Sequence, residues 1–355
     1  MIDLLILVAV VLGIIAISKV VSVLDMVSTA KGENSYAPTE RENRFQARLM
    51  PIFLIAYFGF IIWQMFAWGD RMLPVAASEH GVVVDELMNI TWIVITPVFI
   101  ITHILLFYFA WKYAYDKNRK ATYFSHSNKL EMLWTAIPAL VLLILILYGL
   151  SIWNNITTPL TAEDDKVDIE LYARQFDWTA RYAGEDGQFG KANIRLIEGV
   201  NFLGMDSTDV NGNDDKIVKG EFHLPVGKDV QFYFRAQDVI HSAYMPHFRA
   251  QMNCVPGMVT RFNFKPIKST AEMREITGNE EFDYILMCNK ICGTAHYNMQ
   301  MKIIVESEED YNTWLSEQSQ FVTVEEKKEI KEEEVPQADS SQVAEVESTE
   351  LSSIN

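Results

Sequence analysis

The chain has 355 residues and a formal net charge of −17, and its mean hydropathy is slightly positive. The acidic balance argues against a nucleic-acid-binding protein, because a phosphate-binding surface needs clustered Lys and Arg. A purely soluble acidic protein would usually have a negative mean hydropathy, so part of the chain is expected in lipid. Three cysteines are too few for a disulfide scaffold.

Four apolar stretches are long enough to cross a hydrocarbon core, which takes about 20 residues. The first could instead be a cleaved signal, but it lacks a preceding basic residue and a following Ala-x-Ala. An uncleaved membrane helix is therefore favoured. Trp and Tyr gather at several ends, as at membrane interfaces. The stretches run from about Leu4 to Leu24, Pro51 to Trp68, Thr91 to Trp111 and Met132 to Trp153.

The charges of the loops predict the orientation of these stretches. The loop between the third and fourth stretches holds five basic residues against one acid, Asp116, so it is expected in the cytoplasm. The loop between the second and third holds four acids against Arg71 alone. Both chain ends, and everything after Trp153, are therefore expected on the extracytoplasmic side.

From Val167 to about Glu306 the pattern changes to short runs of period two, such as Val230 to Phe234. Such runs, separated by Gly, Pro and Asn, predict an antiparallel sandwich or barrel. A short helix is expected from Glu309 to Glu317, and the acidic tail after it is expected to be disordered. The expected units are 1–49 (first membrane helix and cytoplasmic loop), 50–90 (second helix and outer loop), 91–156 (transmembrane hairpin), 157–320 (extracytoplasmic β domain) and 321–355 (tail).

Between two predicted strands lies Cys288-Asn-Lys-Ile-Cys292-Gly-Thr-Ala-His296-Tyr-Asn-Met299. Thiolate, imidazole and thioether donors together suit copper, and single-copper electron-transfer sites use one Cys, two His and a weak Met. The second Cys allows two thiolates to bridge two coppers, which would spread the reorganisation on redox change over two ions. A second His is needed, and His241 follows a predicted strand. The alternative is a Cys288–Cys292 disulfide beside a core Met and a loop His, but the four residues at this spacing favour the metal.

These residues resemble cytochrome c oxidase subunit II over roughly residues 127–318. The family pattern Cys-x-x-x-Cys-Gly-x-x-His-x-x-Met stands at Cys288 to Met299, and Asp-Val-x-His-Ser at Asp238 to Ser242. The Pro-Gly turn matches Pro256-Gly257, and Glu-x-x-Trp-Thr-x-x-Pro matches Glu131 to Pro138. The resemblance implies an all-β, cupredoxin-like Greek-key domain behind a helical membrane hairpin. The two N-terminal spans are additional to that hairpin.

The resemblance also implies a role for each ligand in a binuclear copper centre, CuA. Cys288 and Cys292 would bridge the coppers, His241 and His296 would each cap one ion, and Met299 would be a weak ligand. The backbone carbonyl of Lys290 would complete the set. Electrons would leave from the His296 side toward haem a in subunit I, and Glu131 would sit at the cytoplasmic mouth of a proton pathway.

The implied function is that of subunit II of a proton-pumping oxidase in a bacterial inner (plasma) membrane, with the copper domain on the periplasmic side. It would take electrons from cytochrome c, or from a cytochrome c domain of a quinol-oxidising complex. The haems and CuB of subunit I would reduce oxygen, and further partners would be other oxidase subunits and membrane lipid. No Cys-x-x-Cys-His occurs, so the donor is not fused to this chain.

Other functions remain to be separated from this one. The copper domain of a nitrous-oxide reductase shares the motif, but that enzyme needs a large repeat domain. A quinol-oxidase subunit would lack the copper ligands. A membrane-tethered copper carrier or assembly factor would bind a single Cu(I).

The sequence departs from the family pattern at several positions. The family commonly has Glu where Lys290 stands, and that Glu helps to hold magnesium, so Lys290 argues against magnesium binding through this chain. The electron-accepting pair usually reads Gln-Trp-x-Trp, and here it is Gln175-Phe-Asp-Trp178. Phe176 therefore takes the first position and Trp178 the second. An Asp often found ahead of the Pro-Gly turn is Asn253.

Some residues have more ordinary interpretations. His247 could compete with His241, but the Asp-Val-x-His-Ser context favours His241. Cys254 is interpreted as a small buried apolar residue, and His103, inside the third stretch, as a neutral packing residue. The segment Asp206 to Asp215 suggests calcium, but counted from Asp209 it lacks Gly at the sixth position and Glu at the twelfth. We interpret it as an acidic hairpin loop.

Overall fold

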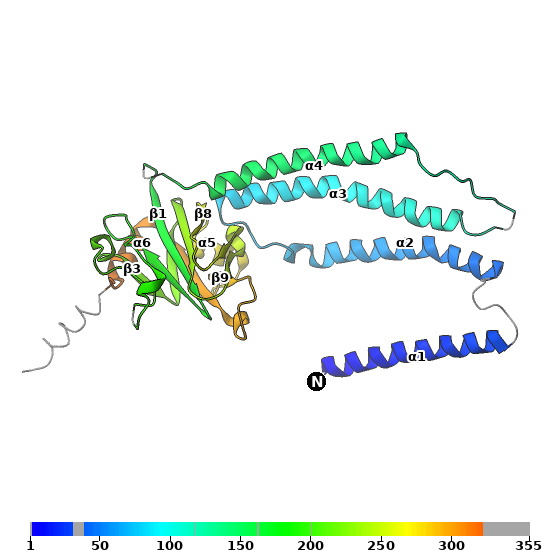
Figure 1. Cartoon of the computed structure of the whole chain (residues 1–355), viewed down its shortest axis with the longest axis horizontal. Coiled ribbons are helices and arrows are strands. Elements are labelled where there is room, and N and C mark those ends of the chain that lie inside the picture. The colour runs from blue at the N-terminus through cyan, green and yellow to red at the C-terminus, as the bar shows by residue number, and fades with distance from the viewer. Residues whose placement is uncertain (1, 31–38, 117, 162, 200, 322–355) are drawn as a thin grey trace, which may run out of the picture. The chain divides into compact units, whose positions relative to one another are not determined.

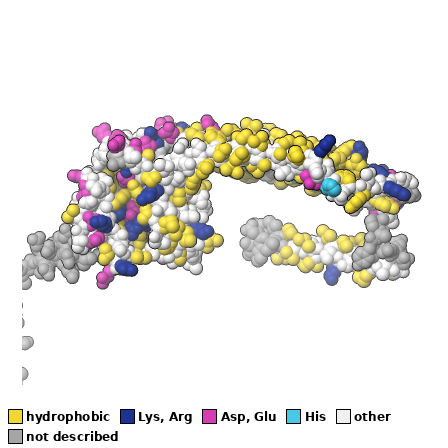
Figure 2. Space-filling model, turned by 45° about the horizontal axis from the view of Figure 1, so that its top comes forward, with side chains coloured by type: hydrophobic (Ala, Val, Ile, Leu, Met, Phe, Trp, Pro, Cys, Tyr) yellow, Lys and Arg dark blue, Asp and Glu magenta, His cyan; other side chains and the backbone are white. Residues whose placement is uncertain are grey.

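The computed structural model describes residues 2–30, 39–116, 118–161, 163–199 and 201–321. Four long helices come first (Figure 1). Each contains one predicted apolar stretch, and all four are long and apolar enough to cross a membrane. Apolar side chains cover the helices in Figure 2, the pattern of helices whose solvent is lipid. The helices are α1 (Ile2–Ala30), α2 (Glu40–Trp68), α3 (Glu79–Lys112) and α4 (Asn128–Thr157).

The described residues after α4 form an all-β, cupredoxin-like domain of two five-stranded sheets, with strand orders β3-β2-β1-β5-β8 and β4-β10-β9-β6-β7. Two short helices accompany the strands, α5 (Thr270–Thr277) and α6 (Glu308–Glu317), and α6 confirms the predicted closing helix. The strands are β1 (Lys166–Arg174), β2 (Asp177–Tyr182), β3 (Lys216–Lys219), β4 (Glu221–Pro225), β5 (Asp229–Ala236), β6 (His241–Met245), β7 (Ala250–Cys254), β8 (Thr260–Phe264), β9 (Tyr284–Cys288) and β10 (Gln300–Glu306).

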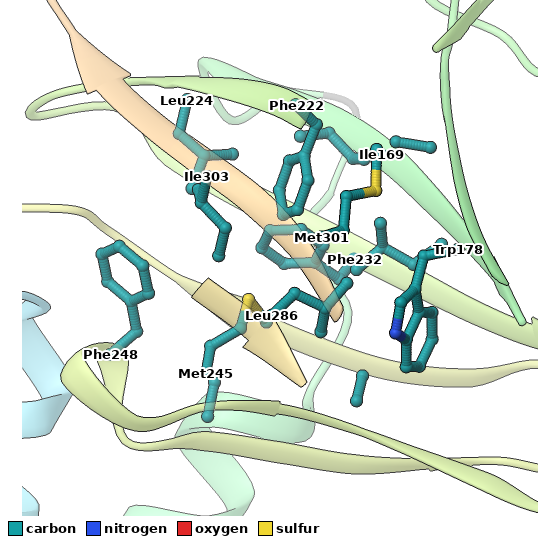
Figure 3. Close-up of a cluster of buried hydrophobic side chains, with 14 of the residues drawn as sticks. Ile169, Trp178, Phe222, Leu224, Phe232, Met245, Phe248, Leu286, Met301 and Ile303 are labelled. Carbon is teal, nitrogen blue, oxygen red and sulfur yellow. The ribbon is translucent and has the colours of Figure 1, made fainter. Parts of the chain in front are cut away.

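Period-two alternation builds the core between the sheets. Ile169 on β1 and Phe232 on β5 are fully buried and paired in register. Leu286 on β9 and Ile303 on β10 point into the same core (Figure 3). The prediction of an antiparallel arrangement is wrong for two pairs, since β1 runs parallel to β5 and β4 runs parallel to β10. Residues 175–228 lie between β1 and β5, which is long enough for the crossover that a parallel pair requires.

Contacts divide the described residues into two compact units. One is made of residues up to Leu73 together with Thr91–Ile137, and the other of Pro74–Ile90 together with the chain from Pro138 onward. The first turns of α3 and the residues before it therefore belong with the β domain. The predicted tail 321–355 lies outside the described residues after Phe321.

Hydrogen bonds attach the segment before α3 to the loop between β6 and β7. Ala77 N donates to His247 O at 2.8 Å, and Ser78 Oγ donates to Phe248 O at 2.7 Å. The guanidinium of Arg249 binds both carboxylate oxygens of Asp85, at 2.8 and 2.9 Å. The outer loop between the second and third stretches thus packs on the β domain, as expected if both lie on one side of a membrane.

Candidate metal centre

The candidate ligands come from three neighbouring strands of one sheet. On β9 the inward residues are Tyr284, Leu286 and Cys288, so the thiol continues the buried alternation of the strand. Met299 directly precedes β10 and lies opposite Cys288, whose N–H donates to Met299 O at 3.0 Å. His241 begins β6, the neighbour of β9 on its other side. Sheet pairing therefore gathers donors that are far apart in the sequence.

The sulfur and nitrogen atoms of these residues are close enough to share metal ions. One ligand atom each from His241, Cys288 and Cys292 lie within 4.8 Å of one another, and all three residues are buried. The Cys288 and Cys292 sulfurs are 3.9 Å apart, far beyond the roughly 2.05 Å of a disulfide bond. Cys288 Sγ is 3.8 Å from His241 Nδ1.

The loop after β9 brings the remaining donors to the second thiol. Cys292 Sγ lies 3.6 Å from His296 Nδ1 and 3.8 Å from Met299 Sδ. The carbonyl oxygen of Lys290 lies 3.2 Å from Cys288 Sγ, while the Lys290 side chain is exposed. The two imidazoles therefore approach different thiols, as a pair of metal ions bridged by both sulfurs would require.

Asp238 and Gln175 hold these ligands in position. His241 Nε2 donates to Asp238 Oδ1 at 2.8 Å, which leaves Nδ1, the nitrogen nearer Cys288, with its lone pair. Gln175 N donates to Asp238 Oδ2 at 2.7 Å, and the Gln175 side-chain amide donates to Cys292 O. Neither residue was assigned a role from the sequence, although both stand inside the motifs quoted above.

The expected electron-accepting pair lies against the same loops. Phe176 is half-buried, and a Cβ at Gly293 (φ 149°) would come within 2.7 Å of its Cζ, so only glycine permits this approach. Trp178 is fully buried, with its ring 6.3 Å from the His241 ring and its Nε1 donating to Met299 O at 3.4 Å. Phe176 is the member of the pair that reaches the surface.

The chemistry of the donor set fits copper. Two thiols, two imidazoles and a thioether are the soft and intermediate donors that bind Cu(I) and Cu(II). Burial and the neighbouring Cys288 thiol raise the pKa of Cys292 to about 11. Metal binding must therefore release a firmly held proton.

The other residues considered from the sequence lie in different surroundings. His247 packs edge-on against Phe282 and Tyr284, with ring centroids 5.1 and 5.4 Å away, and is not part of the ligand group. Cys254 is fully buried, and burial raises the pKa of its thiol to about 12. His103 Nδ1 donates to Phe99 O at 2.8 Å among the aromatic rings of α2 and α3. Glu131 accepts from Ser127 N at 3.3 Å in the first turn of α4.

The acidic segment uses its carboxylates locally. Asp206 Oδ1 accepts from Thr208 N at 3.0 Å, and Asp209 Oδ2 accepts from Lys191 N at 2.9 Å. Asp215 Oδ2 pairs with Arg181. The segment is a loop containing one short 3-10 turn, Val210–Gly212.

Two family models match this chain. The transmembrane domain of cytochrome c oxidase subunit II matches residues 62–152, and the periplasmic domain of that subunit matches residues 169–308. The alternative cytochrome c oxidase subunit 2 of Bradyrhizobium diazoefficiens is 34% identical over 276 residues, which cover 76% of this chain and 91% of the relative. The chain belongs to the cytochrome c oxidase subunit II family.

Two further subunit II proteins show lower sequence identity. Cytochrome c oxidase subunit 2 of Thermostichus vulcanus is 28% identical over 279 residues, 71% of this chain and 80% of that protein. The crystal structure of the periplasmic domain of subunit II from Bradyrhizobium japonicum is 21% identical, with a TM-score of 0.29, and covers 44% of this chain and 95% of that one. As a member of the subunit II family, the chain is a membrane-anchored component of an oxidoreductase with a separate β domain.

Proposed function

We propose that the β domain holds a binuclear copper centre and carries electrons from a cytochrome c to subunit I of the oxidase. The observation that carries this proposal is the arrangement of the two thiols, 3.9 Å apart, each with its own imidazole within 3.8 Å. When bound, the copper pair would supply one-electron redox chemistry. The proposed ligands are His241, Cys288, the carbonyl of Lys290, Cys292, His296 and Met299.

The protein's own residues make the site rigid. The carboxylate of Asp238 fixes the ring of His241, and Gln175 connects this carboxylate to the Cys292 loop. A ligand set that cannot move changes little between oxidation states, which lowers the cost of transferring an electron. We assign Phe176 to the surface end of the incoming electron route and Trp178 to the position behind it. The half-buried position of Phe176 and the full burial of Trp178 support this order.

The remaining roles follow from family membership. Electrons would pass from the His296 side to haem a, and the haems and CuB of subunit I would reduce oxygen. Glu131, exposed in the first turn of α4, would serve at the mouth of a proton pathway. The β domain would face the periplasmic side of a bacterial inner membrane, because the acidic loop before α3 packs on it.

Copper loading of the full-length chain in detergent tests the centre. A near-infrared absorption band and an EPR signal delocalised over two coppers are expected. A fully loaded chain that lacks both signals would overturn the two-copper proposal, and a single Cu(I) per chain would favour a copper carrier.

Electron acceptance is tested separately in the intact oxidase. Phe176→Leu should slow the oxidation of reduced cytochrome c and leave the copper spectrum unchanged. Tyr297→Leu is a matched comparison, because Tyr297 is an 87% exposed aromatic residue on the ligand loop. If Tyr297→Leu slows the reaction and Phe176→Leu does not, the assignment of Phe176 is wrong.

A further inference from the structure

A polar cavity lies between the first turns of α2 and the end of α3 with the loop that follows it. Its volume is about 370 Å³, and its lining includes four basic residues and two acids: Arg44, Arg48, Lys112, Arg119, Glu40 and Asp116. The cavity thus carries an excess of two positive charges. All these residues belong to one compact unit. The copper centre makes no use of this cavity.

The helices α2 and α3 run side by side (Figure 1), and direct contacts join them. Phe53 of α2 packs on Phe107 of α3, with ring centroids 5.4 Å apart. Asn43 Nδ2 donates to Tyr115 O at 3.3 Å, which ties the start of α2 to the loop after α3. The Thr39–Glu42 capping box fixes the first turn of α2. These contacts fix the first turns of α2 and the loop after α3, which form the walls of the cavity.

Most of the positive charge lacks a carboxylate partner. Arg44 pairs with Glu40 at 2.9 Å. Arg119 donates to two carbonyls, Lys112 O at 3.0 Å and Ala114 O at 2.6 Å, and Lys112 Nζ donates to Tyr108 OH at 2.7 Å. Among the residues described, the side chain of Arg48 has neither a hydrogen bond nor an ion pair. Three cations therefore converge on the cavity, and none of them pairs with a carboxylate of the described chain.

The cavity lies at the boundary between the charged ends of the two helices and their apolar surfaces. Arg48 stands three residues before Pro51, where the apolar run of α2 begins, and Lys112 directly follows Trp111. Trp111 lines the cavity and is half-exposed. Exposed apolar side chains such as Ile52 (62%) and Phe109 (47%) continue along both helices. A ligand with a negative head and apolar chains would satisfy both surfaces.

We propose that this cavity binds the phosphodiester headgroup of an anionic phospholipid, with Arg48 and Arg119 as its main contacts and the acyl chains along α2 and α3. Arginine presents planar pairs of donors that match phosphate oxygens. Basic pockets between membrane helices have the geometry and charge to hold such headgroups. A free phosphate would meet the same cations but would leave the adjoining apolar surface uncovered.

Native mass spectrometry of the full-length chain in detergent tests the proposal. The chain is titrated with phosphatidylglycerol and, in parallel, with zwitterionic phosphatidylcholine. One phosphatidylglycerol should bind more tightly than phosphatidylcholine. The double variant Arg48→Gln/Arg119→Gln should weaken phosphatidylglycerol binding roughly 30-fold, from about fivefold per cation. Arg41→Gln removes a charge from the same end of α2 but outside the lining, and should change nothing.

The control titrations distinguish a bound lipid from a bound free phosphate. Equal binding of the two lipids, or unchanged binding by the double variant, overturns the proposal. Displacement of phosphatidylglycerol by millimolar inorganic phosphate would assign the cavity to free phosphate and also overturn it. Because Arg119 bonds two carbonyls, its loss can disturb the loop. The single variant Arg48→Gln breaks no contact among the described residues, so unchanged binding by this variant, with helix content intact, is equally decisive against the proposal.

Discussion

The β domain contains two clusters of polar side chains inside the protein, and they differ in how their charges are balanced. We call Glu170, Arg181, Asp215 and Arg235 the charge cluster. Arg181 binds Glu170 at 3.0 Å and Asp215 at 3.4 Å, and Arg235 binds Glu170 at 3.0 Å. Two protein cations thus face two carboxyl groups, and burial raises the pKa of Asp215 to about 7.

The ligand cluster, formed by His241, Cys288, Cys292, His296 and Met299, has no such balance. Its thiols must lose protons to bind metal, and bound metal ions would balance the negative charges that result. The charge cluster contains its own cations, and the ligand cluster is suited to an added cation. The ligand cluster consists of thiols, imidazoles and a thioether, and its thiols become anionic when a metal ion binds.

The largest effect is expected when a bridging thiol is removed, because the ligand cluster then loses its means of holding two metal ions. Cys292→Ser should abolish the two-copper spectrum of the loaded chain, because serine cannot bridge two copper ions. His241→Ala should also destroy the spectrum, whereas His247→Ala should preserve it. The ligand assignment is wrong if the effects of the two histidine variants are reversed.

The next largest effect is expected from a substitution in the charge cluster. Arg181→Met should lower the free energy of unfolding by about 3–5 kcal/mol, since Glu170 and Asp215 would remain buried with one cation fewer. Chemical unfolding of the full-length chain in detergent measures this. Arg195→Met is the control, because Arg195 is exposed, and its effect should stay within about 0.5 kcal/mol. Equal effects of the two variants would contradict the role given to the cluster.

Removal of the carboxylate behind a ligand should have a smaller effect. Asp238→Ala frees the ring of His241 and should weaken copper binding by about 10–100-fold without abolishing it. Competition with a copper chelator gives the affinity. Asp177→Ala removes a nearby surface carboxylate that pairs with Lys219, and it should leave the affinity unchanged. An unchanged affinity in Asp238→Ala would show that the ring is held by packing alone.

The smallest effect concerns His247, a half-buried histidine outside both clusters. Burial, with the Arg249 charge nearby, lowers the pKa of His247 in the folded protein. The unfolded chain, with a pKa near 6.5, therefore takes up the proton first, so stability is present above about pH 6.5 and is lost as the pH falls below it.

His247→Phe should flatten this part of the stability curve, by at most about 1.4 kcal/mol per pH unit. Unfolding of both proteins from about pH 7.5 to about pH 5.5 measures the difference. Parallel curves would mean that other groups cause the pH dependence.

Local patterns in the sequence determined much of this protein. Hydropathy located four helices, and period two located strands such as β5 and β9, because both depend on neighbouring residues. The spacing from Cys288 to Met299 predicted the ligand loop, because a short loop between two strands brings its donors together whatever the rest of the fold.

Only the tertiary structure decided how distant residues meet. The pairing of β6 with β9 brings His241 to Cys288, and the pairing of β1 with β5 is parallel. The contacts of Asp238 with Gln175 and of Asp85 with Arg249 join segments more than 60 residues apart. Register between distant strands depends on the packing of whole faces, which no local pattern encodes. For the same reason, the sequence alone did not predict the cavity between α2 and α3.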